Sequence, residues 1–164
     1  MNVEHIVRDV PAGATMLIAD GEMELHVEQK SAEELVCRVM RDCTLRSRKS
    51  VNVPNVSIDL PSATEKDRMY IEWATENGVD FIAHSFVRRA RDVEAVQAIL
   101  DSRNSGIKII SKIENQEGID NIDEIIEASY GIMVARGDLG VELPAEIIPI
   151  TQRMIVDECI AAKR

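Results

Sequence analysis

The sequence lacks the features that would assign it to a membrane, to nucleic acid or to an oxidising compartment. Its 164 residues carry 19 lysines and arginines against 29 aspartates and glutamates, a formal net charge of −10. This charge argues against nonspecific binding to nucleic acid or to anionic membranes. No apolar run approaches the roughly 20 residues of a membrane span, and the N-terminus lacks the apolar core of a signal peptide. The three cysteines show no CxxC spacing, so we expect reduced thiols and a cytoplasmic protein.

The apolar content is that of a globular protein, and its pattern differs between two regions. From about Thr15 to Pro54 short apolar segments alternate with period two around an Asp20–Gly21 pair, which is typical of a hairpin. Residues 31–34 resemble a helix capping box, but the alternation over residues 35–39 favours a strand. This region therefore predicts short strands with little helix.

From about Ser57 onward, predicted strands alternate with predicted helices. The expected strands cover residues 80–86, 108–113 and 131–135, and the expected helices cover residues 65–77, 90–102, 119–128 and 145–162. Such alternation predicts a parallel sheet with right-handed crossovers. On the first of these helices we expect Trp73 to face the core.

Polar residues follow each of these predicted strands. They are His84–Ser85, Lys112 with Glu114, and Arg136–Gly137–Asp138. In parallel α/β folds, ligands bind at the carboxyl ends of strands. Glu114 and Asp138 supply the hard oxygen ligands that Mg²⁺ prefers, and Lys112 can offset charge on a phosphoryl group. Gly137 lets the backbone approach an anion closely, and we expect a helix start near Ala145 to favour that anion further.

Each of these features also has an ordinary structural interpretation. Lys112 and Glu114 fit a surface ion pair, Asp138–Gly140 fits a simple turn, and His84 fits a hydrogen-bonded structural histidine. Glu142 is expected to be a solvated acid. The basic cluster Arg88–Arg91 is expected to be solvated, with a subunit or phosphate contact as the alternative. What distinguishes the chemical interpretation is that three adjacent strand ends carry one coherent set of groups.

The segments ISKIENQEG (110–118) and IMVARGDLGVELP (132–144) resemble the signature segments of pyruvate kinase. The similarity extends to residues 81–88, 59–67 and 49–54. It implies an α/β fold: part of a (β/α)₈ TIM-type barrel, preceded by part of a small all-β lid domain. On this basis residues 1–57 would be the C-terminal part of the lid, and residues 58–164 a partial catalytic barrel with about three of the eight strands.

The resemblance also implies residue roles in the second region. Lys112 matches the lysine that stabilises the transferring phosphoryl group and the enolate. Glu114 and Asp138 match the protein ligands of the essential Mg²⁺, for which Mn²⁺ can substitute. The residues that would line the phosphoenolpyruvate site are Ala135, Arg136, Gly137 and Asp138, and Ser85 matches a serine near the monovalent cation K⁺.

In the first region, Lys49 matches a lysine that contacts the nucleotide. The sequence departs from the family pattern beside it, because Ser50 and Asn55 stand where the family usually has glycine. These departures raise the question of how this segment folds.

The function implied is phosphoryl transfer from phosphoenolpyruvate to ADP, giving pyruvate and ATP in glycolysis. Because most barrel strands are absent, we expect the segment alone to be inactive and to leave open sheet edges that favour self-association; the full-length family forms tetramers. One alternative is therefore an incomplete, self-associating module that binds metal and phosphate. Another is a different Mg²⁺-dependent barrel enzyme acting on enolates or 2-oxo acids, which would need no β-rich segment before Asp59.

Overall fold

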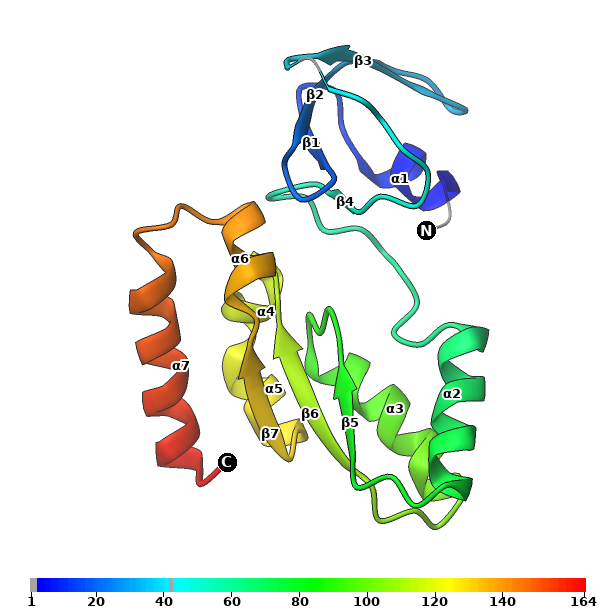
Figure 1. The fold of residues 1–164 in the computed structure, drawn as a ribbon, viewed down its shortest axis with the longest axis vertical. Helices are drawn as coiled ribbons and strands as arrows, with labels where there is room; N and C mark the ends of the chain where they lie inside the picture. Colours follow the sequence, from blue (N-terminus) through cyan, green and yellow to red (C-terminus); the bar gives the residue numbers. More distant parts are fainter. Residues whose placement is uncertain (1–2, 42) are drawn as a thin grey trace. The chain divides into compact units, whose positions relative to one another are not determined.

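The computed structural model describes residues 3–41 and 43–164, which divide after Leu60 into two compact units (Figure 1). The first unit contains helix α1 (Val3–Asp9) and a four-stranded antiparallel sheet in the order β3-β2-β1-β4. Its strands are β1 (Thr15–Ile18), β2 (Met23–Lys30), β3 (Leu35–Val39) and β4 (Val51–Asn52). Its core is built from Ile6, Val10, Met16, Val27 and Val53.

The hairpin predicted at Asp20–Gly21 joins β1 to β2. Ala19, Asp20 and Gly21 have φ values of 55°, 58° and 90°, the left-handed region that tight hairpin turns require. The strand predicted over residues 35–39 is also confirmed as β3. The Ser31 hydroxyl accepts the N–H groups of Glu33 and Glu34 at 3.2 and 3.1 Å, so this apparent capping box closes a turn instead of starting a helix.

The second unit is built around a parallel sheet in the order β5-β6-β7. Its strands are β5 (Phe81–His84), β6 (Lys108–Ile113) and β7 (Gly131–Val134). Its helices are α2 (Glu65–Glu76), α3 (Ala90–Ser102), α4 (Gln116–Asp120), α5 (Ile122–Ala128), α6 (Arg136–Glu142) and α7 (Ile148–Ala162). The predicted alternation and parallel sheet are therefore confirmed.

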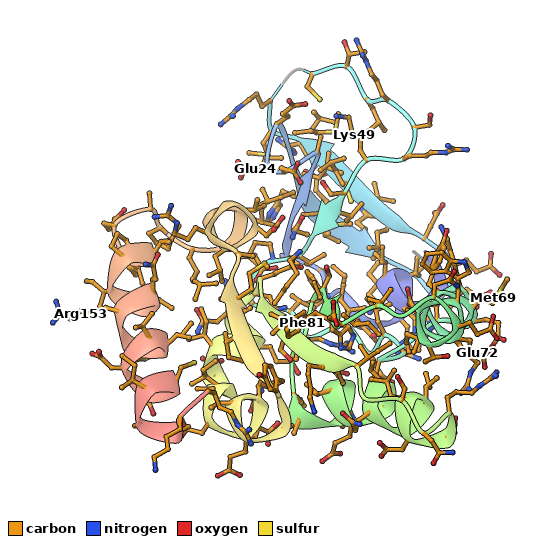
Figure 2. All side chains as sticks on the ribbon, turned by 60° about the horizontal axis from the view of Figure 1, so that its bottom comes forward. Glu24, Lys49, Met69, Glu72, Phe81 and Arg153 are labelled. Carbon is orange, nitrogen blue, oxygen red and sulfur yellow. The ribbon has the colours of Figure 1, made fainter. Side chains whose placement is uncertain are left out.

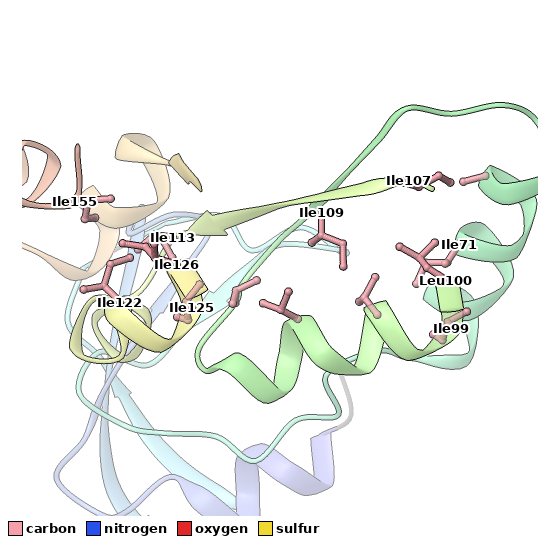
Figure 3. Packing of buried hydrophobic residues seen from close by; sticks show 14 residues of the cluster. Ile71, Ile99, Leu100, Ile107, Ile109, Ile113, Ile122, Ile125, Ile126 and Ile155 are labelled. Atoms are coloured by element: carbon pink, nitrogen blue, oxygen red, sulfur yellow. The ribbon is translucent and has the colours of Figure 1, made fainter. Parts of the chain in front are cut away.

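The core of the second unit lies between one face of this sheet and its helices. Figure 3 shows Ile109 and Ile113 of β6 above Leu100 of α3 and Ile125 of α5. Side chains of a strand alternate between faces, so Lys108, Ile110 and Lys112 point to the opposite face. That face carries exposed apolar side chains, among them Phe81 (53% exposed).

Two predicted helices are divided differently in the structure. The helix expected over residues 119–128 consists of α4 and α5, and α4 begins earlier because the Asn115 side chain caps it, accepting the Gly118 N–H at 2.8 Å. The helix expected from about Ala145 begins three residues later, at Ile148.

The prediction that Trp73 faces the core is wrong, because its side chain is 58% exposed. The buried residues of α2 are Ile71 and Ala74, three positions apart on one face. Trp73 lies two positions from Ile71 and so points away from the buried face, as does Met69; Tyr70, beside Ile71, is also exposed. Figure 2 shows Met69 and Glu72 projecting from this helix.

The mixed α/β architecture agrees with the predicted fold class at that level. The three described strands of the second unit form an open sheet that does not close into a barrel. The assignments of residues 1–57 as a lid and 58–164 as a barrel segment stay predictions. Among the described residues, every helix is too short or too polar to span a membrane.

Candidate functional site

The candidate site lies at the carboxyl edge of the parallel sheet. The pairs His84–Ser111 and Ile113–Val134 align the ends of the three strands. The N–H of Ala135 donates to the carbonyl of Ile113 at 3.1 Å, which continues the pairing just beyond β7. The residues that follow each strand therefore lie along one edge, where parallel α/β folds bind ligands.

Lys112 connects the ends of β5 and β6. Its ammonium group forms an ion pair with the carboxylate of Glu114 and donates a hydrogen bond to the Ser85 hydroxyl at 3.1 Å. The Glu114 side chain is only 7% exposed. Because the carboxylate of the pair is buried, this is not an ordinary surface ion pair. A buried carboxylate needs such compensation, because its desolvation is costly.

The second carboxylate oxygen of Glu114 is held by the backbone. It accepts the N–H of Phe86 at 3.0 Å. Phe86 has a φ of 61°, a left-handed conformation that bulky residues rarely adopt and that the surroundings must enforce. The turn after β5 is thus shaped to present an N–H group to the carboxylate.

A buried Arg88–Asp92 pair anchors that turn. Asp92 is 1% exposed and accepts the Arg88 N–H at 2.9 Å, the Arg88 guanidinium at 3.2 Å, and the hydroxyl of Ser62. Burial is the largest single influence and would raise the pKa of Asp92, but the bonds from Ser62 and Arg88 together outweigh it and lower that pKa. The prediction that Arg88 is solvated is therefore wrong. Its neighbour Arg89 stays half-exposed and pairs with Glu117 at 2.7 Å.

His84 has the environment of a structural histidine. Its Nε2 lies 3.2 Å from the Ser62 carbonyl oxygen, and it is largely buried on the helix-facing side of β5. Burial, the largest influence, lowers the pKa of His84. This favours the neutral imidazole and agrees with the structural interpretation of this residue.

Residues Arg136–Asp138 form the first turn of the short helix α6, and not a simple turn. All three are exposed, whereas the next residue, Leu139, is fully buried. Glu142, at the end of α6, is half-buried and its carboxylate accepts the Gln116 N–H at 3.2 Å. The expectation that Glu142 is a solvated acid is therefore wrong; the contact joins residues 26 positions apart, and local sequence carried no signal for it.

Of the two predicted metal ligands, Glu114 directly follows β6, and Asp138 lies in the first turn of α6, which follows the neighbouring strand β7. Within residues 3–41 and 43–164, no group of three or more His, Cys, Asp or Glu side chains gathers as a metal site. Mg²⁺ commonly takes only one or two carboxylates and completes its shell with substrate oxygens and water. The donor set present is therefore chemically compatible with Mg²⁺ or Mn²⁺.

Lys49 belongs to the first unit, where it is exposed on the segment before β4 (Figure 2). Both departures from glycine beside it have a structural explanation. The Ser50 hydroxyl donates to the Asp20 carboxylate at 2.5 Å and accepts the Asp20 N–H at 3.1 Å, so it ties the Lys49 segment to the hairpin. Asn55 has a φ of 62°, which asparagine tolerates better than most residues.

Comparison with known proteins gives a consistent result over the whole chain. The family model described as "Pyruvate kinase, barrel domain" matches residues 1–164. A protein of Borreliella burgdorferi named pyruvate kinase is 55% identical over 160 residues, which cover 97% of this chain and 34% of that protein. A pyruvate kinase of Bacillus licheniformis is 51% identical over 161 residues, covering 96% of this chain and 28% of that protein. The chain thus spans about a third of these curated relatives.

Proposed function

The chain belongs to the pyruvate kinase family, and from this premise we propose that it carries part of the site that transfers a phosphoryl group from phosphoenolpyruvate to ADP. The observation that carries the proposal is the position of Lys112, whose ammonium group contacts Ser85 and the buried carboxylate of Glu114. A fixed cation at a ligand-binding sheet edge suits a reaction in which negative charge moves between oxygens.

In this proposal, the positively and negatively charged residues at the sheet edge have different roles. Lys112 offsets charge on the transferring phosphoryl group and on the enolate that it leaves. Glu114 and Asp138 hold Mg²⁺ or Mn²⁺, which when bound neutralises phosphoryl charge. The first turn of α6, with Ala135 before it, supplies the contact surface for phosphoenolpyruvate, and Gly137 leaves room there because nothing lies within 4 Å of a Cβ built on it.

Two further assignments belong to the same proposal. Ser85, held by Lys112 at 3.1 Å, lies near the K⁺ position, and Lys49 of the first unit contacts the nucleotide. We assign residues 1–57 to a lid and residues 58–164 to a barrel segment that works in a longer, oligomeric and cytoplasmic enzyme. The support is the family membership together with the two compact units.

A second candidate function is a self-associating module that binds metal and phosphate without turnover. The observation that favours it is the exposed sheet face, on which Phe81 is 53% and Met133 45% exposed. Open sheet edges and apolar faces promote association. A discrete oligomer in sizing chromatography would support this function, whereas polydisperse aggregate would contradict it.

The proposed metal site is tested by titrating the 164-residue chain with Mn²⁺ and following free Mn²⁺ by electron paramagnetic resonance. We expect binding in the wild-type chain and its loss in a Glu114→Gln/Asp138→Asn double variant, because both substitutions remove a carboxylate. Glu146→Gln is the matched control, since this nearby glutamate is exposed. Equal binding in the double variant would refute the two assigned ligands, and absence of binding in the wild-type chain would show that this segment does not assemble the site.

A further inference from the structure

Helix α6 is bonded at both of its ends to the residues that flank the connection between β6 and α4. Before its first turn, the Ala135 N–H donates to the Ile113 carbonyl at 3.1 Å. At its last residue, the Glu142 carboxylate accepts the Gln116 N–H at 3.2 Å. Between them the fully buried Leu139 packs α6 onto the unit. The segment that carries Asp138 is therefore attached to the rest of the unit by these three contacts, while its first turn is exposed to solvent.

The bond from Gln116 satisfies a backbone group that α4 cannot satisfy itself. Gln116 is the first residue of α4, and the first N–H groups of a helix have no partner within it. The Asn115 side chain takes the Gly118 N–H at 2.8 Å, and Glu142 takes that of Gln116. A carboxylate at this end is also favoured by the helix dipole.

The same arrangement occurs one strand–helix unit earlier. There the Glu124 carboxylate of α5 accepts the N–H of Ala90, the first residue of α3, at 3.0 Å. In both cases an acid from the following unit caps the helix of the preceding one. The Glu142 contact is thus one of two similar contacts between successive strand–helix segments. This recurrence supports the interpretation that the contact is part of the fold and not incidental.

We propose that Glu142 is a positioning residue that sets the placement of Asp138 relative to Glu114. Only Asn115 separates Glu114 from Gln116, and Asp138 lies one helical turn before Glu142, so the Glu142–Gln116 bond joins the two segments that carry the proposed metal ligands. A seven-residue helix is not stable by its own hydrogen bonds, so α6 depends on such anchors. The metal part of this inference rests on the proposed function; the anchoring part does not.

The test uses the 164-residue chain with three substitutions at Glu142 and beside it. Glu142→Met removes the acceptor at similar size, Glu142→Gln retains an acceptor oxygen, and Glu146→Ala is an exposed control. The readouts are amide hydrogen exchange at Leu139 and Leu143, whose N–H groups donate to the carbonyls of Ala135 and Leu139 at 3.0 and 2.8 Å, and Mn²⁺ affinity by electron paramagnetic resonance. Losing one charge-assisted hydrogen bond predicts about tenfold faster exchange and about tenfold weaker Mn²⁺ binding for Glu142→Met. The loss should be smaller in Glu142→Gln, which keeps an acceptor oxygen but not the charge, and absent in the control.

The two readouts separate this inference from the proposed function. If the wild-type chain binds no Mn²⁺, the metal assignment fails, and exchange at Leu139 and Leu143 decides alone. Faster exchange in Glu142→Met supports the anchor, and unchanged exchange overturns it. If Mn²⁺ binds, equal affinity in the wild-type chain and Glu142→Met overturns the positioning role. Circular dichroism checks that the Met variant is folded. If it is not, Gln116→Pro removes the donated N–H at the first position of α4, where proline is tolerated. The same outcomes in exchange and Mn²⁺ affinity then support or overturn the inference.

Discussion

Lys112 of β6 forms an ion pair with Glu114, the residue that directly follows this strand, and the same ammonium group donates a hydrogen bond to Ser85, which directly follows β5. The carboxylate is also fixed by the Phe86 N–H at 3.0 Å. The pair therefore has one defined geometry, set by residues of two different strand ends. Charged groups whose positions are set by the fold are what electrostatic catalysis requires.

Replacement of Lys112 by methionine in a full-length enzyme carrying this segment is expected to lower kcat by about 10²–10³-fold. The KM for phosphoenolpyruvate should change less, since the charge that Lys112 offsets develops mainly in the transition state. Lys108→Met is the matched control, because Lys108 lies on the same strand and face at the opposite end. Steady-state kinetics give the answer, and an unchanged kcat in Lys112→Met would remove this residue from the mechanism.

Gly118 is required by a close approach of α4 to the turn after β5. A Cβ at this position would lie 2.7 Å from the Val87 carbonyl oxygen, a backbone atom that cannot move alone. We expect Gly118→Ala to lower the free energy of unfolding by about 1–3 kcal/mol in urea titrations. Gly106→Ala, where nothing lies within 4 Å, should be close to neutral. Equal losses in the two variants would contradict the steric explanation.

The stability of the second unit should depend on the protonation of His84. Burial lowers the pKa of His84 in the folded chain below its ordinary value of 6.5. As the pH falls below about 6.5, the unfolded chain takes up the proton first, so the free energy of unfolding decreases until the folded pKa is passed. Urea titrations between pH 7.5 and 5 measure this slope, which His84→Gln should reduce. A slope that persists in His84→Gln would assign it to another group.

Trp73 is the single tryptophan of the sequence and is 58% exposed. We therefore expect acrylamide to quench its fluorescence efficiently in the folded chain, with an emission maximum only slightly shifted on unfolding. Measuring the quenching at several protein concentrations distinguishes a Trp73 side chain that is exposed from one that is covered when the chain associates. Efficient protection that grows with protein concentration would show that this face of α2 is covered by a second copy.

Strong local periodicity explains which elements could be predicted. The helix at residues 90–102 and the strand at residues 108–113 have the bounds expected from the sequence, because each shows a clean apolar pattern between turn signals. The short helix α6 was missed, and its residues were interpreted as a turn. Seven residues with a single buried side chain, Leu139, carry too weak a pattern to identify a helix.

The orientation of Trp73 shows a related limit. An apolar residue on a helix is compatible with either face, and the position of Ile71 and Ala74 against the core decided which face of α2 is buried. Arg88 illustrates the reverse case: a cluster of basic residues suggested solvent exposure, yet Asp92, four residues further on, binds this side chain in the interior. For both residues, the packing of the helix against the rest of the unit determined the environment, which residue type alone did not indicate.

The sequence by itself determined the alternation of strands and helices, the polar residues at three strand ends and the family to which the chain belongs. These properties reside in residue order, which periodicity and motif spacing record directly. Only the tertiary structure decided that Glu114 is buried against Lys112 and the Phe86 N–H, and that Glu142 is bonded to Gln116. The physical reason is sequence separation. The Phe86 N–H and the Glu114 carboxylate, and likewise the Gln116 N–H and the Glu142 carboxylate, belong to residues more than 25 positions apart. Such contacts exist only once parallel pairing has brought the strand ends into register.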